Sequence, residues 1–133
     1  SNGSSAYGWR MPTAREFQVT IDCADPGPLA RFWADVLGYR VQGDGEACVN
    51  PAGVGPRIWF QRVPEGKVVK NRLHLDVRVA TGLVGDERLQ VLEAEGSRLE
   101  ALGASRVRLL IADDENESCL VMQDLEGNEF CLD

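Results

Sequence analysis

Apolar and polar residues along the first half of the chain follow a pattern that changes from strand-like to helix-like and back. Residues 16–22 alternate between apolar and polar, which is typical of a strand with one buried face. Asp25 and Pro26 supply an N-cap followed by proline in the first helical turn, and apolar residues at helical spacing continue up to Gly38, which predicts the end of the helix. Three shorter strands are predicted after it, at residues 39–42, 47–50 and 57–62.

The second half repeats the same order of elements. Residues 63–71 contain proline, glycine and two lysines, and predict a linker. Residues 72–77 alternate again, and residues 87–102 have helical spacing up to Gly103. Strands are then predicted at residues 105–110, 118–122 and 129–133. The chain therefore consists of two copies of one strand-helix-three-strand unit.

Two such copies predict an α+β fold made of tandem βαβββ modules. Their strands are expected to form a curved, mostly antiparallel sheet with the helices on the outside and a concave pocket inside. We expect a single domain over residues 16–133, with module one at 16–62, the linker at 63–71 and module two at 72–133. Residues 1–15 are expected to be a disordered arm or an artificial extension.

Charge and hydropathy narrow the range of partners. Net charge is −7, from 14 basic and 21 acidic residues, and an acidic chain repels the phosphates of nucleic acids. No apolar run reaches the length of about 18 residues that a membrane span needs. We therefore expect a small-molecule partner, with no nucleic acid and no membrane.

The four cysteines lie in apolar, strand-like segments and show no C-x-x-C spacing. This favours four reduced, half-buried thiols in a cytoplasmic protein over a disulfide or a zinc site.

Side chains alternate across a sheet, so each predicted strand assigns its residues to one of two faces. Phe17 and Leu73 are among the apolar residues expected on the helix-covered face. The residues expected on the open face are Gln18, Thr20, Asp22, Trp59, Gln61, His74, Asp76, Glu129 and Cys131. Trp59 suits either the pocket floor or a dimer interface.

Four of these residues, each from a different strand, offer a polar side chain to the same surface. His74 supplies an imidazole, Glu129 a carboxylate, and Gln18 and Gln61 supply amide oxygens. This set is suited to a divalent metal, and equally to hydrogen bonding of a ligand's carbonyl or carboxylate.

Several segments resemble proteins of the vicinal-oxygen-chelate superfamily. Residues 18–25, 29–33 and 36–38 resemble the opening of these proteins, which include glyoxalase I, extradiol dioxygenases, fosfomycin-resistance enzymes and bleomycin-binding proteins. Residues 60–65, 70–76 and 124–131 resemble a bacterial glyoxalase-like subgroup. The likeness covers nearly the whole chain from Phe17 onward.

The resemblance implies a site, a metal and a quaternary structure. The metal ligands of such proteins correspond here to Gln18, Gln61, His74 and Glu129, and the ion would be Ni, Zn, Mn or Fe. Gln61 departs from the pattern, because a carboxylate is usual there. A homodimer is expected from the resemblance alone.

Two functions follow from this comparison. The first is a divalent-metal-dependent lyase or isomerase, with Glu129 as general base and Thr20, Trp59, Asp76 and Cys131 around the substrate. The second is a metal-free protein that sequesters a bulky cationic or aromatic compound. The missing carboxylate at position 61 favours the second function. The prevalence of enzymes in the superfamily favours the first.

Overall fold

The predicted order of elements is found in the computed structural model, which describes residues 13–133. Module one contains β1 (Gln18–Cys23), α1 (Pro26–Leu37), β2 (Arg40–Gln42), β3 (Ala47–Val49) and β4 (Arg57–Arg62). Module two contains β5 (Asp76–Val77), α2 (Gly85–Ala101), β6 (Ser105–Leu110), β7 (Cys119–Gln123) and β8 (Glu129–Leu132). The arm expected over residues 1–15 lies almost wholly outside the described residues.

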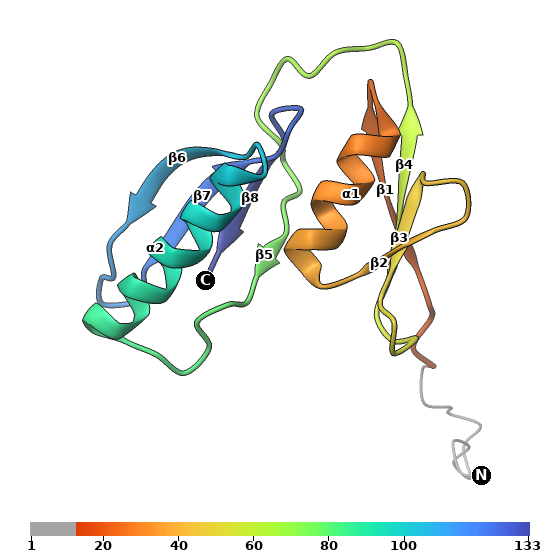
Figure 1. The fold of residues 1–133 in the computed structure, drawn as a ribbon. Helices are drawn as coiled ribbons and strands as arrows, with labels where there is room; N and C mark the ends of the chain where they lie inside the picture. The colour runs from red at the N-terminus through yellow and green to blue at the C-terminus, as the bar shows by residue number, and fades with distance from the viewer. Residues whose placement is uncertain (1–12) are drawn as a thin grey trace, which may run out of the picture.

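Each module forms its own four-stranded sheet, and the two sheets have the same internal order (Figure 1). The orders are β1-β4-β3-β2 and β5-β8-β7-β6. Within each sheet the first pair is parallel and the other two pairs are antiparallel. This confirms the predicted α+β fold of two βαβββ modules. The strands pair within modules only, so within residues 13–133 no ladder joins the two sheets.

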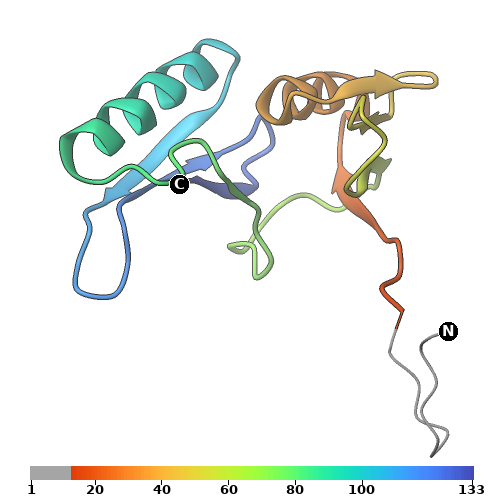
Figure 2. The same ribbon diagram turned by 90° about the horizontal axis from the view of Figure 1, so that it is seen from below.

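The two helices lie on the same side of the molecule (Figure 2), each over the sheet of its own module. Helix α1 ends as predicted, because Gly38 adopts a left-handed conformation with φ of 68° and donates its N–H to the carbonyl of Ala34. Asp25 occupies the N-cap position, but its side chain makes no capping hydrogen bond there. Its carboxylate lies 3.8 Å from Arg62 instead.

The hydrophobic core joins the modules although the sheets do not. Trp33 of α1 and Phe130 of β8 are fully buried against each other, with ring centroids 4.9 Å apart in an edge-to-face arrangement. The indole Nε1 of Trp33 also donates a hydrogen bond of 2.9 Å to Asp124, which is buried in module two. Helix α1 is therefore fixed to the turn that precedes β8.

Two residues expected in the core are exposed. Phe17 is 68% exposed and lies before the first residue of β1, while Leu73 is 81% exposed. Only two residues, Asp76 and Val77, pair with β8 where the alternation had predicted a strand over residues 72–77. Alternation assigns a face only where a ladder holds the backbone extended, so it fails in the unpaired segment before β5.

The four cysteines are in the reduced state that their spacing predicts. All four cysteines are free thiols, with Cys23 and Cys48 buried and Cys119 and Cys131 partly buried. Neither helix among residues 13–133 is long and apolar enough to cross a membrane.

Candidate ligand-binding cavity

A cavity of about 550 Å³ lies between β1 and the beginning of module two. This volume suits a small organic molecule, because ligand pockets usually measure about 300–1,000 Å³. Its apolar wall includes Val19, Ile21, Val63, Leu73 and Leu75, and its ionisable groups are Asp22, Glu65, Lys67, His74, Glu126 and Glu129. Four carboxylates face one ammonium, so the cavity carries a net negative charge whether or not His74 is protonated.

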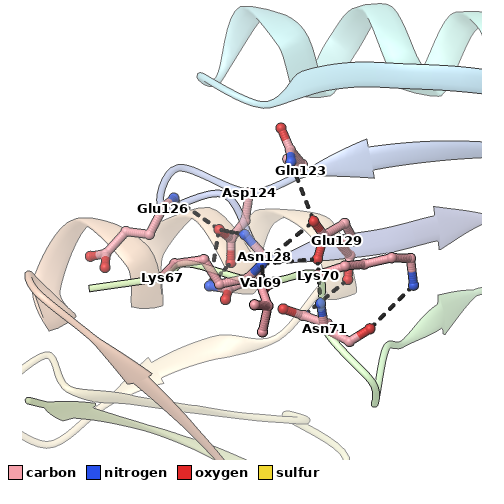
Figure 3. A network of polar contacts seen from close by, with 9 residues as sticks. All are labelled: Lys67, Val69, Lys70, Asn71, Gln123, Asp124, Glu126, Asn128 and Glu129. Carbon is pink, nitrogen blue, oxygen red and sulfur yellow. Dashed lines mark hydrogen bonds and ion pairs between the residues drawn. The ribbon is translucent and has the colours of Figure 1, made fainter. Parts of the chain in front are cut away.

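The Glu129 carboxylate of the cavity is held by Lys67, Asn71 and Gln123 (Figure 3). Its Oε1 accepts a hydrogen bond of 2.9 Å from the backbone N–H of Asn71 and lies 3.2 Å from Nζ of Lys67. Gln123 donates to its Oε2 at 3.4 Å, and the side chain is 13% exposed. The Asn71 hydrogen bond, with those of Lys67 and Gln123, lowers the pKa of Glu129 to about 2. Glu129 is therefore a fixed negative charge at neutral pH.

The linker between the modules forms one wall of the cavity because it is bonded to Glu129. Lys67 donates to the carbonyl of Val69 as well as contacting Glu129, and the Asn71 side chain donates to the carbonyl of Glu129 at 3.4 Å. Periodicity gave no indication of these contacts, because the linker has no regular secondary structure. The only available signal was the presence of the polar residues Lys67 and Asn71 in the predicted linker.

The turn between β7 and β8 forms another part of the wall and is organised by Asp124. The Asp124 carboxylate accepts hydrogen bonds from the backbone N–H groups of Glu126 at 2.8 Å and Asn128 at 3.0 Å, in addition to the Trp33 indole. Glu126 in turn accepts from the backbone N–H groups of Ala24 at 2.7 Å and Asp25 at 2.9 Å. Residues of module two thus fix the end of β1 and the start of α1.

Some of the residues predicted for the open face meet in this cavity and others do not. Thr20, Asp22, His74 and Glu129 line it. Gln18 lines a separate hollow and accepts a hydrogen bond of 2.7 Å from Arg57. Trp59 lies on β4, where the Arg57 guanidinium stacks over its ring at 5.2 Å, and it does not line the cavity.

The two glutamines proposed as metal ligands lie at opposite ends of the β1–β4 pair. Gln18 is opposite Arg57, whereas Gln61 is opposite Asp22. Four residues of strand, or about 13 Å, separate the two positions. The set of Gln18, Gln61, His74 and Glu129 is therefore not assembled around one point in this structure, and the residues do not fit a single ion.

Asp76 and Cys131 face a different hollow, on the other side of His74. They are paired in the β5–β8 register, and Nε2 of His74 lies 3.3 Å from Oδ1 of Asp76. Burial, with the neighbouring Cys119 thiol and Asp76, raises the pKa of Cys131 to about 12. The Cys131 thiol is thus protonated at neutral pH, which does not suit a reactive nucleophile.

Comparisons with known proteins agree on one type of domain. The model of a family described as a glyoxalase-like domain matches residues 18–132. A comparison with curated protein sequences gives no match.

Three solved structures share the fold at low sequence identity. A glyoxalase/bleomycin resistance protein/dioxygenase family enzyme from Burkholderia phytofirmans is 14% identical, with a TM-score of 0.63 over 86% of this chain and 94% of that chain. A variant of the fosfomycin resistance protein FosX from Listeria monocytogenes, complexed with Mn(II) and a dihydroxypropylphosphonic acid, is 13% identical, with a TM-score of 0.65 over 92% of this chain and 90% of that chain. The oxidase ChaP-H2 is 17% identical, with a TM-score of 0.54 over 91% of this chain and 93% of that chain. At these identities the likeness is evidence of a common fold only.

Proposed function

Because this chain belongs to the glyoxalase-like domain family, we propose that it binds a small organic cation with an apolar body in the cavity beside Glu129. The family match confirms the resemblance to the vicinal-oxygen-chelate superfamily and supports a small-molecule-binding fold. The observation that carries the proposal is the composition of the cavity, in which carboxylates outnumber ammonium groups and the remaining wall is largely apolar. An apolar wall gives binding energy by burying the body of the ligand, and the carboxylates select its charge.

Lys67 supports this proposal because its ammonium occupies the position that we assign to the cationic group of the ligand. Its Nζ lies 3.2 Å from Oε1 of Glu129 and donates to the carbonyl of Val69. A carboxylate and a carbonyl together satisfy two of the three N–H donors of an ammonium group. A ligand ammonium would displace Lys67, whose side chain is 26% exposed and has room to move into solvent.

The alternative of a metal-dependent lyase or isomerase has less support from the geometry. A general base works best with a pKa near the operating pH, whereas the pKa of Glu129 is about 2. Both oxygens of Glu129 already accept hydrogen bonds, and Gln18 and Gln61 are far apart along β1 and β4. We therefore favour binding of the ligand without Ni, Zn, Mn or Fe at the four-residue set.

We also propose that the protein is a cytoplasmic homodimer. Strand β6 is at the edge of its sheet and exposes apolar side chains near its end, including Leu109, Leu110 and Ile111. A second copy of the chain would cover them. Light scattering at micromolar concentration tests this, and a monomer mass would contradict it.

The binding proposal is tested with three probes of nearly the same shape and different charge. Isothermal titration compares benzylamine, which is an ammonium at pH 7, with neutral benzyl alcohol and anionic benzoate. We expect benzylamine to bind most tightly and Glu129→Gln to weaken it about tenfold, since one partly buried charge pair contributes on the order of 1–2 kcal/mol. Lys67→Met removes the competing ammonium and is expected to tighten benzylamine binding.

Lys70→Met is the matched control, because Lys70 lies in the same linker but donates only to the carbonyl of Asn71. It is expected to leave the affinity for benzylamine unchanged. Tighter binding of benzoate than of benzylamine, lost in Lys67→Met, would mean that Lys67 anchors an anion and would overturn the proposal. Equal binding of all three probes would overturn it as well.

A further inference from the structure

Three side chains of different metal-binding chemistry meet where β5 joins β8, beside the cavity described above, with which they share only His74. His74, Asp76 and Cys131 each offer one ligand atom, and these atoms all lie within 4.8 Å of one another. They line a hollow that also includes Cys119 and Asp133.

The β5–β8 register brings these residues together. Asp76 pairs directly with Cys131, and the backbone N–H of Cys131 donates to the carbonyl of Leu75 at 3.0 Å. His74 is two residues before Asp76, and its Nε2 lies 3.3 Å from Oδ1 of Asp76. Its imidazole is thereby directed along the strand toward Asp76 and Cys131.

We propose that His74, Asp76 and Cys131 bind a zinc ion. Zinc lies about 2.0–2.2 Å from nitrogen and oxygen ligands and about 2.3 Å from sulfur in a tetrahedral arrangement. Two ligands of such a tetrahedron are therefore about 3.3–3.6 Å apart. The separation of His74 and Asp76 already has this value, and the thiol needs to approach by little more than about 1 Å, which a side-chain rotation supplies.

The ligand types decide which metal is favoured. A thiolate and an imidazole prefer zinc to magnesium, calcium or manganese, which prefer oxygen ligands. Three protein ligands leave the fourth position of the zinc ion for a water molecule. This site shares only His74 with the four-residue set implied by the family resemblance, and it uses neither glutamine nor Glu129.

The site also differs from what the cysteine spacing predicts, which is four thiols without a metal. Spacing shows only metal sites whose ligands are close in sequence. Here Cys131 comes from β8, Asp76 comes from β5, and His74 lies two residues before β5. Only the parallel pairing of β5 with β8 places them together.

Titration of the reduced, full-length protein with Co(II) tests the proposal, because cobalt replaces zinc and its bond to a thiolate absorbs in the near ultraviolet. We expect saturable binding of one Co(II) per chain, a thiolate-to-cobalt absorption band and displacement of cobalt by zinc. Cys131→Ser is expected to abolish the band, and Asp76→Asn to weaken the affinity at least tenfold. Zinc is expected to raise the melting temperature of the wild type but not of Cys131→Ser.

Cys119→Ser is the matched control, because Cys119 neighbours Cys131 but is not one of the three ligands. It is expected to keep the band and to bind cobalt within about threefold of the wild-type affinity. Glu129→Gln is also expected to keep the band, which separates this site from the cavity. Absence of the band in the wild type, or a band that survives Cys131→Ser and is lost in Cys119→Ser, would overturn the proposal.

Discussion

Replacement of Glu129 by glutamine is expected to remove a pH-dependent part of the stability of the fold. In the wild type the carboxylate holds the linker through Asn71 and Lys67, and it accepts a further hydrogen bond from Gln123. Glutamine has nearly the same shape and keeps one acceptor oxygen, but it has no charge. The substitution therefore tests the negative charge itself rather than the packing around it.

The magnitude follows from the pKa of this carboxyl group in the folded and unfolded chains. The pKa is lowered from 4.5 to about 2 by the hydrogen bonds of Asn71, Lys67 and Gln123. Each pKa unit corresponds to about 1.4 kcal/mol, so the full shift sets an upper limit of roughly 3.5 kcal/mol. Because Lys67 is partly exposed and its contact is screened by solvent, we expect about 1–2 kcal/mol.

The direction of the pKa shift determines whether the stability rises or falls with pH. A group with a lowered pKa in the folded state stabilises the fold above its unfolded pKa, here about 4.5, and this stabilisation is lost as the pH falls toward 2. The wild type should therefore lose more stability between pH 6 and about pH 3 than Glu129→Gln does.

Urea denaturation at a series of pH values from 6 to about 3 measures this difference. Glu65→Gln is the matched control, because Glu65 lines the same cavity and makes no hydrogen bond within residues 13–133. It is expected to keep the pH dependence of the wild type. Identical pH profiles of the wild type and Glu129→Gln would refute the assignment of Glu129 as the charged anchor of the linker.

Two further substitutions test buried polar contacts of the fold, those of Asp124 in the turn beside the cavity and those of Arg88 in α2. Asp124→Ala should lower the free energy of unfolding by about 3–5 kcal/mol, because it leaves the buried Trp33 indole without an acceptor and frees the β7–β8 turn. Chemical denaturation measures this loss, and a loss below about 1 kcal/mol would contradict the role of Asp124. Arg88→Met should lower the free energy of unfolding by about 2–4 kcal/mol. The buried guanidinium donates to the carbonyls of Ser118 and Ala80 at 2.9 Å, and methionine replaces only the apolar stem of the arginine. A melting temperature equal to that of the wild type would contradict this expected loss of stability.

The order of elements could be predicted from the sequence because local signals mark each boundary. Gly38 ends α1 through its left-handed backbone, and Pro26 begins it. The alternation before β5 was misleading for a physical reason: residues 72–74 do not pair with β8, so no ladder fixes which way Leu73 points. The alternation of residue types is a property of the sequence, whereas pairing depends on the whole fold.

The candidate cavity could be predicted only in part. The alternation rule places Thr20, Asp22 and Glu129 on the concave side, and these residues line the cavity, but Val19 and Ile21, which the rule places on the opposite face, line it as well. It fails for Gln18 because alternation gives the face of a residue and not its position along the strand, which only the β1–β4 register determines.

The contacts of the linker could not be predicted by any periodic rule. Lys67 and Asn71 reach Glu129 because the chain between the modules passes beneath β8, and this path depends on the packing of both modules. The nearness of Cys131 to His74 and Asp76 likewise depends on a parallel pairing between distant parts of the sequence.

The binding of a cation beside Glu129 is tested most directly by backbone amide NMR during titration with benzylamine. We expect saturable shifts at the amides of Asn71, Glu129 and Thr20, which surround the cavity, and none at the Trp59 indole on β4. Shifts confined to the hollow beside Gln18, or no saturable shift at Asn71 and Glu129, would contradict the proposed function.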